Sequence, residues 1–301
     1  LIKEQNHFNS GTIYPTPTIH YISDHKQVVE GAINVLESFK SWSELEFSSC
    51  NYGQITALAG EISMQSVLTG IQLCLNKHAH ALVTAPISKE SIQLAGYKVP
   101  GHTEYLMEQT GVEDVVMMLS GRGLNICLLT THLPLKSVVN HINKATLVSK
   151  IRIIRTHFNT YKPDRVPKIA LLGINPHAGD GGVLGYEEQE IIEPVLESFR
   201  NDPTVELTGP FPADAFFGRK HFLEYDVVLA AYHDQGLTPF KLWSMGKGVN
   251  CTLGLPFIRT SPDHGTAFDI VGKWEAEPDS MLEAYKVALA YLSKSKKTNP
   301  I

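Results

Sequence analysis

The sequence predicts an α/β fold in which a largely parallel sheet is covered by helices on both faces. Short, continuous apolar runs alternate along the chain with longer segments whose apolar residues recur at helical spacing. Strands that are apolar throughout are typical of sheets buried on both faces. With 301 residues, 43% of them hydrophobic and no internal repeat or linker, the chain can bury one large core, either in one domain or shared by two lobes.

The individual elements follow from the same patterns. We expect helices over 54–76, 135–159, 187–200 and 280–294, and strands over 80–87, 114–120, 124–132, 168–177 and 226–233. Only the Gly-Arg-Gly turn at 121–123 separates the second strand from the third, so these two should pair with each other.

The composition argues against several classes of partner. The net charge of −5 and the lack of a basic block disfavour nucleic acid and anionic membranes. No apolar run reaches the ~18 residues that a membrane span needs. The four cysteines form no CxxC pair, and Cys74, Cys127 and Cys251 lie in apolar stretches, which predicts reduced, buried thiols. The chain starts LIKEQNHFNS, which is not a signal peptide. We therefore expect a cytoplasmic protein.

Three of the apolar runs end in a histidine, and these are His132, His177 and His233. A lone histidine in such a place is most often a hydrogen-bonded loop residue. Ligands of open α/β sheets bind beyond the carboxyl ends of the strands, however, and three imidazoles there could form an open metal site. Imidazole ligands favour Zn, Co, Ni or Fe over Mg, although Asp180, Asp214 or Asp234 could shift that balance.

A second group of side chains suits a bound anion. It comprises His102, Thr103, Lys241, Asn250, Arg259 and His264. Guanidinium, ammonium and hydroxyl or amide donors together can bind phosphate or carboxylate. A lone Lys or Arg usually lies on a solvated face, but Arg259 follows the apolar run LGLPFI. Neither GxxxxGK[ST] nor GxGxxG is present, and the Gly-rich stretch at 179–185 is weak evidence, so a Rossmann cofactor site is not supported.

Taken together, these stretches resemble one family. The stretches are GQITALAGE, ALVTAPISK, GHTEYL, VVMMLS, TTHLPL, GINPHAGDGG, GPFPAD, YHDQGL and GVNCTLGLPFIRTSPDHGTAFDI, between about residues 53 and 272. They are similar, in the same order, to those of the 4-hydroxythreonine-4-phosphate dehydrogenases, NAD-dependent enzymes of pyridoxal phosphate biosynthesis. That family opens with a strand and a Gly-rich GDPxGIGPE-like segment. Nothing before residue 53 matches it, so we expect these elements to be absent and the activity of this chain to depend on them.

The resemblance implies an isocitrate/isopropylmalate-dehydrogenase-like fold with two lobes that share one sheet. Residues 1–94 with 262–301 would form the outer, cofactor-side lobe, and 95–261 a central lobe with the metal site and the dimer interface. The active site would be shared across a homodimer, with His233 the first candidate for a metal ligand supplied by the neighbouring subunit.

The same resemblance assigns roles to individual residues. His132, His177 and His233 would bind a divalent metal, Zn or Co rather than Mg. His102, Thr103, Lys241, Asn250 and Arg259 would bind substrate. His264, Gly265 and Thr266, in an adenosine loop like that of the wider superfamily, would bind NAD, or NADP in its place, without a Rossmann motif.

The reaction implied is oxidation of 4-phosphooxy-L-threonine to a β-keto acid, which then loses CO₂. Asp214 and Asp234 are candidates, by chemistry alone, for the group that takes the hydroxyl proton. The alternatives are a dehydrogenase of the same fold acting on phosphorylated threonate or erythronate, a metal-dependent hydrolase, and a binding module without catalysis.

Overall fold

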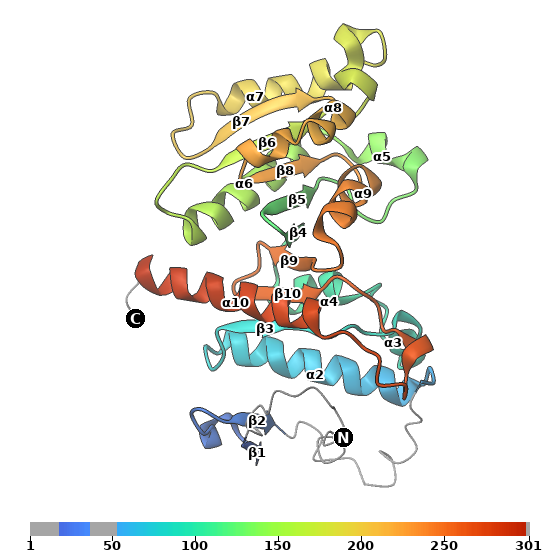
Figure 1. Cartoon of the computed structure of the whole chain (residues 1–301), viewed down its shortest axis with the longest axis vertical. Coiled ribbons are helices and arrows are strands. Elements are labelled where there is room, and N and C mark those ends of the chain that lie inside the picture. The colour runs from blue at the N-terminus through green and yellow to red at the C-terminus, as the bar shows by residue number, and fades with distance from the viewer. Residues whose placement is uncertain (1–17, 37–52, 299–301) are drawn as a thin grey trace. The chain divides into compact units, whose positions relative to one another are not determined.

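The computed structural model describes residues 18–36 and 53–298, which belong to two compact units, Leu1–Ser49 and Cys50–Ile301 (Figure 1). In the first unit, β1 (Ile19–Ile22) and β2 (Ile33–Leu36) pair in parallel, with Ile19 opposite Ile33. A short 3₁₀ turn, η2 (His25–Gln27), lies between them, and the Asp24 side chain caps it by accepting the Lys26 N–H.

The second unit contains all the other described elements. Its helices are α2 (Ala57–Leu75), α3 (Lys89–Leu94), α4 (His102–Thr110), α5 (Leu135–His141), α6 (Lys144–Tyr161), α7 (Glu193–Phe199), α8 (Ala213–Gly218), α9 (His233–Ser244) and α10 (Asp279–Thr298). Its strands are β3 (Ala81–Val83), β4 (Val116–Gly121), β5 (Leu124–Leu128), β6 (Lys168–Leu172), β7 (Glu206–Phe211), β8 (Val227–Ala230), β9 (Val249–Leu253) and β10 (Ile258–Pro262). Shorter turns are η3 (Pro176–Gly182), η4 (Glu188–Ile192), η5 (His221–Glu224) and η6 (Phe268–Ile270).

The eight strands form one continuous sheet in the order β3-β10-β9-β4-β5-β8-β6-β7. This confirms the α/β class. The expectation of a largely parallel sheet is only half right, because the pairs β4–β5, β4–β9 and β9–β10 are antiparallel. The predicted pairing of β4 with β5 is confirmed. Arg122 and Gly123 form its two-residue turn, both with positive φ, and such a connection allows only an antiparallel partner.

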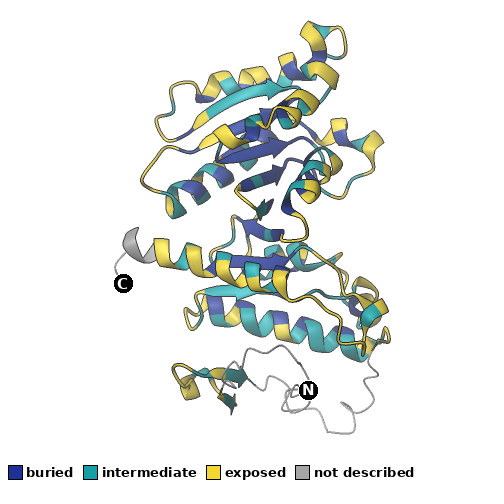
Figure 2. Cartoon of the chain, in the orientation of Figure 1, coloured by how far each residue is buried: buried dark blue, intermediate teal, exposed yellow. Residues whose placement is uncertain are grey.

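Alternate residues of the central strands face opposite sides of the sheet. On β5, Cys127 packs with α6, α7 and α10, whereas Ile126 and Leu128 pack with α8 and α9. Both sides are covered, so β8 is buried along its length and β5 is buried at every residue except Asn125 (Figure 2). The thiols of Cys74, Cys127 and Cys251 are reduced and buried as predicted, and Cys50 lies outside the described residues.

A third apolar cluster joins α2, α3 and α4 beside β3, with Met64, Ile71, Ile92 and Leu106 at its centre. The helices α2 and α3 approach so closely that a Cβ on Gly60 would lie 2.0 Å from the carbonyl oxygen of Ser91. Glycine at this position therefore allows α3 to pack this closely against α2.

The segment 135–159, expected as one helix, is two. Asn143 interrupts it with an extended backbone and starts α6 with a capping box: its side chain accepts the Thr146 N–H at 3.0 Å, and Thr146 Oγ1 accepts the Asn143 N–H at 3.2 Å. Apolar periodicity continues through the break, which is why it did not reveal the cap.

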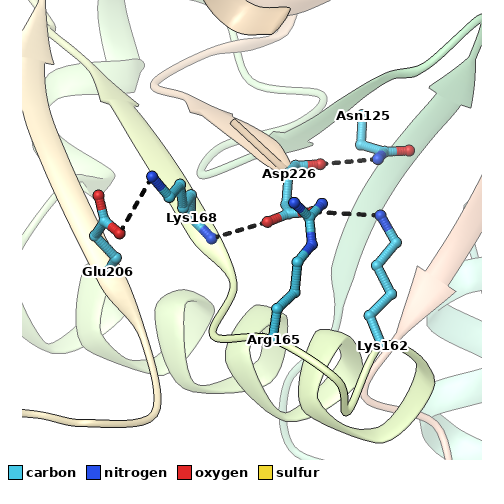
Figure 3. A network of polar contacts seen from close by, with 6 residues as sticks. All are labelled: Asn125, Lys162, Arg165, Lys168, Glu206 and Asp226. Carbon is cyan, nitrogen blue, oxygen red and sulfur yellow. Dashed lines mark hydrogen bonds and ion pairs between the residues drawn. The ribbon is translucent and has the colours of Figure 1, made fainter. Parts of the chain in front are cut away.

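Asp226 holds three strands together at the edge of the sheet where β5, β6 and β8 begin (Figure 3). Its buried carboxylate accepts the Lys168 N–H at 3.1 Å and pairs with Arg165 and Lys162. Its carbonyl accepts from Asn125 Nδ2 at 2.8 Å. This network fixes the first residues of β5, β6 and β8 relative to one another. Because the three strands are parallel, His132, His177 and His233 all follow at the opposite end of the sheet.

No helix in the described part of the chain is long and apolar enough to cross a bilayer.

Candidate active site

A cavity of about 750 Å³ lies where β9 and β10 meet the loop after β3, the start of α4 and the loop after β5. All five residues expected to bind substrate line it: His102, Thr103, Lys241, Asn250 and Arg259. They come from α4, α9, β9 and β10, elements far apart in the sequence. The set predicted from the sequence is thus gathered around one space.

Strand alternation explains why Asn250 and Arg259 reach this cavity. Asn250 pairs with Ser261 across β9 and β10, and both line the cavity together with Arg259. The intervening residues point the other way: Cys251 packs in the core, and Thr260 donates its hydroxyl to the Ala284 carbonyl of α10. Asn250 and Arg259 therefore lie within strands. The sequence analysis had expected the ligand-binding residues beyond the ends of strands.

Arg259 is a buried cation, with 4% of its surface exposed. Its Nη1 donates to Thr252 Oγ1 at 2.9 Å and its Nη2 donates to Thr84 Oγ1 at 2.7 Å. Burial lowers its pKa to about 10, so it remains charged at neutral pH. No carboxylate in the described part of the chain pairs with it. A buried, uncompensated guanidinium favours an anionic ligand.

Three polar atoms of this site are buried without a hydrogen-bond partner among the described residues. They are His102 Nε2, Asn250 Oδ1 and Arg259 Nε. Buried polar atoms are nearly always paired, and leaving one unpaired costs about 1–3 kcal/mol. Burial, and secondarily the charge of Arg259, lower the pKa of His102 to about 3, so its imidazole is neutral. A ligand with acceptor and donor groups would satisfy all three atoms.

Lys241 reaches the cavity from α9 and pairs with Asp263, at 2.5 Å between Nζ and Oδ2, and also donates to the Asp263 carbonyl at 3.2 Å. Asp263, which lines the cavity, is the first residue of the loop 263–269 expected to bind the adenosine end of NAD, and its ion pair with Lys241 was not predicted. Lys89 and Glu104 also line the cavity and were missed. Each stands inside a quoted stretch, ALVTAPISK or GHTEYL, but nothing in the local pattern distinguished it from a solvated charge.

His132, His233 and His177 follow β5, β8 and β6, three neighbouring parallel strands. Their equivalent topological positions are therefore as predicted. The rings of His132 and His233 are 5.7 Å apart between centroids. Nδ1 of His233 lies 2.7 Å from Asp234 Oδ1, a contact that leaves Nε2 for a ligand. Burial, then the charges of Lys89 and His233, lower the pKa of His132 and favour its neutral, ligand-ready form.

His177 is held differently. It lies in η3 with φ of 55°, in a run of left-handed residues that continues through Gly181. It does not line the cavity. Within the described residues, 18–36 and 53–298, no three His, Cys, Asp or Glu side chains are grouped so that they could hold a metal ion. The single chain thus assembles two of the three predicted ligands, and the metal assignment stays a prediction.

The remaining predicted residues divide between the cavity and its surroundings. His264 and Gly265 line it, and Thr266 does not. A Cβ on Gly265 would meet nothing within 4 Å, so the backbone there is open to a ligand. Asp214, in the first turn of α8, and Asp234 are exposed and outside the lining. Asp234 contacts His233, and for Asp214 the structure offers no contact with the site.

The fold and the site together define an α/β protein with a polar cavity at its sheet and a histidine pair at that cavity. Within that class, the family model "Pyridoxal phosphate biosynthetic protein PdxA" matches residues 4–288. The chain belongs to this family.

Curated relatives and solved structures agree with that assignment. The 4-hydroxythreonine-4-phosphate dehydrogenase of Sulfurihydrogenibium sp. is 44% identical over 238 residues, covering 79% of this chain and 73% of the relative. The enzyme of the same name from Chromobacterium violaceum is 44% identical over 236 residues, covering 78% and 72%. The crystal structure of 4-hydroxythreonine-4-phosphate dehydrogenase from Klebsiella pneumoniae superposes with a TM-score of 0.80 at 35% identity, covering 91% of this chain and 82% of that one.

A more distant structure, a terephthalate 1,2-cis-dihydrodiol dehydrogenase from Burkholderia xenovorans, gives a TM-score of 0.65 at 27% identity, with coverage of 88% and 82%. The names shared by these relatives support a dehydrogenase role, and the family links the chain to pyridoxal phosphate biosynthesis.

Proposed function

We propose that this protein oxidises the secondary alcohol of 4-phosphooxy-L-threonine with NAD⁺, and that the β-keto acid so formed decarboxylates to 3-amino-2-oxopropyl phosphate. The single observation that carries this proposal is the cavity lined by all five expected substrate residues, three of them with unpaired buried polar atoms. A phosphorylated hydroxy acid has the anionic and hydrogen-bonding groups that these atoms lack.

The phosphate would bind at Arg259, with His102 and Thr103 at the start of α4 beside it. Arg259 supplies fixed charge, and its position is set by Thr84 and Thr252 before any ligand arrives. Unpaired N–H groups at the start of a nine-residue helix add a favourable field for an anion. With a pKa of about 3, His102 is too weak a base to take the alcohol proton, and it serves as a hydrogen-bond partner.

The proposed divalent metal would lie at the histidine pair beside this cavity. His132 and His233 would hold it, and Asp234 would orient His233 through Nδ1. When bound, such an ion lowers the pKa of a hydroxyl group and polarises the ketone formed from it. All-imidazole ligands favour Zn or Co over Mg. We propose that the protein acts as a homodimer and that His177 of a second copy completes the ligand set.

The loop after β10 suits the adenosine end of NAD, or of NADP. His264 and Gly265 border the cavity, and the space at Gly265 leaves its backbone accessible. Bound NAD⁺ supplies the hydride acceptor. The contribution of the chain would be to hold the alcohol carbon at the histidine pair, in a fixed orientation toward the nicotinamide end of the cofactor.

The alternative substrates are phosphorylated threonate and erythronate, which lack the amino group. In this proposal the cavity residues described above would contact the phosphate and hydroxyl groups that all these substrates share, so they would not separate them. A metal-dependent hydrolase would use the same histidines but would have no use for the open loop at Gly265.

The test is to mix the purified protein with NAD⁺, Zn²⁺, Co²⁺ or Mg²⁺, and each candidate substrate, and to follow NADH by its absorbance. We expect NADH with 4-phosphooxy-L-threonine and at least about a tenfold loss of kcat/KM in Arg259→Gln, because an ionic hydrogen bond contributes roughly 1.5–3 kcal/mol. Arg219→Gln, at an exposed arginine, is the control and should behave as the unmodified protein. NADH with only the threonate or erythronate phosphates would move the assignment to those substrates, and phosphate release without NADH would favour the hydrolase.

A further inference from the structure

The loop after β6 holds His177 in a strained backbone. Residues 177–182 all have positive φ, between 45° and 103°, although His177, Ala178 and Asp180 are not glycines. Left-handed backbone is unfavourable for a residue with a Cβ, so such a run persists only where the surrounding structure holds it. The next irregular element, η4, is a π-helical turn that leads directly into α7, and such turns are frequent at functional sites.

Glu188, the first residue of η4, is a buried carboxylate with 2% of its surface exposed. Its Oε1 accepts the N–H groups of Ile174 and Asn175, both at 2.7 Å, and its Oε2 accepts from Asn175 Nδ2 at 3.0 Å. No Lys, Arg or His of the described chain lies within ion-pair distance of it. The carboxylate therefore depends on the loop for its partners, and the loop depends on the carboxylate.

The same carboxylate also meets the loop beyond His177. A Cβ on Gly179 would lie 2.7 Å from Glu188 Oε2, so this part of the chain packs directly on the carboxylate. Residues 174–175 and residue 179 thus lie against one side chain, and His177 stands between them with its own side chain exposed. The start of the loop is tied to α9, because Gln235 Nε2 donates to the Gly173 carbonyl at 2.7 Å.

We propose that Glu188 is a positioning residue, which holds the left-handed loop in the conformation that presents His177 as a metal ligand. This inference rests on the proposed function, in which His177 of a second copy completes the ligand set. A ligand donated across an interface must be oriented by its own loop, since the other ligands belong to the receiving chain. Groups that orient metal ligands from outside commonly determine metal affinity.

The test measures the dissociation constant of Co²⁺ from the visible absorption of the bound ion, without substrate or NAD⁺. Glu188→Gln keeps the size of the side chain but replaces one acceptor oxygen by a donor. Glu190→Gln, at an exposed glutamate of the same π-helical turn, is its control. Gly179→Ala would push a Cβ into the carboxylate. Its control is Gly181→Ala, because Gly181 is also left-handed but a Cβ there would meet nothing within 4 Å.

Glu188→Gln and Gly179→Ala should each weaken Co²⁺ binding roughly 10- to 100-fold, and the two controls should stay within about threefold of the unmodified protein. In a His177→Ala background, Glu188→Gln should change the affinity by less than about twofold, because its effect passes through that imidazole. A merely structural role would weaken binding in both backgrounds. If Glu188→Gln does not fold, the pair of glycine variants decides.

Unchanged affinity in Glu188→Gln and Gly179→Ala, or equal losses with and without His177, would overturn the proposal and leave the metal ligands as proposed. If the unmodified protein bound no Co²⁺, or if His177→Ala bound it normally, this inference and the metal assignment would both be wrong. Neither substrate nor NAD⁺ enters the measurement, so a dependence on Glu188 would stand even if the NADH assay refuted the proposed reaction.

Discussion

His157 shows how one buried side chain can make stability depend on pH. Its ring lies 4.8 Å from those of Tyr161 and Tyr291 between centroids, in a second cavity of about 420 Å³ between α6, β9 and α10. Nε2 is buried without a partner in the described structure. Burial, then the charge of Lys162, lower the pKa of His157 to about 3. The folded protein keeps this ring neutral, while the unfolded chain takes up a proton as the pH falls below about 6.5.

The consequence is a loss of stability as the pH falls from about 6.5 toward 3. Between pH 7 and 5 the unmodified protein should lose about 2 kcal/mol more of its free energy of unfolding than His157→Phe, which keeps an aromatic ring but cannot titrate. Urea unfolding at several pH values measures this. His80→Phe, at an exposed histidine, should leave the pH slope unchanged. Parallel pH profiles for the unmodified protein and His157→Phe would show that this ring does not stay neutral.

At the scale of elements, α9 connects the packing of the sheet to the candidate site. The helix begins at His233 and ends at Ser244, and its Lys241 lines the cavity. Its first turn is tied to β6 and β8: Gln235 accepts the Ala231 N–H and donates to the Gly173 carbonyl, both at 2.7 Å. The sequence predicted His233 as the last residue of a strand over 226–233, but it is the first residue of this helix. The short polar run HDQG conceals the helix because its apolar face begins only at Gly236 and Leu237.

Gly236 sets the distance between α9 and the sheet. A Cβ there would lie 2.7 Å from Ile126 Cγ2 and 3.0 Å from the Ala230 Cβ. Gly236→Ala should therefore lower the free energy of unfolding by about 1–3 kcal/mol and reduce activity, because the helix that carries His233 must shift. Gly218→Ala, in α8 with open space at its Cβ, is the control. If the two variants were equally stable in urea unfolding, α9 could accept a Cβ at residue 236 without moving, which would contradict the close contact with Ile126.

At the scale of the whole molecule, the open question is where the third imidazole comes from. One chain brings His132 and His233 together, and His177 lies outside the cavity lining. This pairing argues against His233 as the ligand donated by a neighbour and favours His177. The shared site is a proposal, and it predicts which pairs of inactive variants regain activity when they form mixed dimers.

Mixing His132→Ala with His177→Ala should restore activity, because one site of each hybrid dimer then has His132 and His233 from one chain and His177 from the other. With equal mixing the recovery should approach roughly a quarter of the unmodified activity, as half the dimers are hybrids with one intact site of two. Mixing His132→Ala with His233→Ala should restore nothing. Recovery in that second mixture, under conditions where subunit exchange is demonstrated, would show that His132 or His233 is the donated ligand.

The sequence by itself determined the α/β class, the main helices and the buried strands, because periodicity reflects which faces are covered. It determined the β4–β5 pairing through a two-residue turn, and it placed three histidines after neighbouring strands. It also marked five residues that the structure gathers around one cavity. These features depend on local spacing or on a distinctive order of motifs along the chain.

Only the tertiary structure decided which of those residues meet, and how. The contact of Arg259 with Thr84 joins positions 175 residues apart. The contact of Lys241 with Asp263 joins α9 to the residue that follows β10. The strands β9 and β10 were missed because polar residues facing the cavity interrupt their apolar pattern. The same polar residues that hide the strand pattern of β9 and β10 in the sequence line the cavity in the structure. Whether a lysine such as Lys89 is solvated or faces a ligand depends on long-range packing, and spacing along the chain carries no record of it.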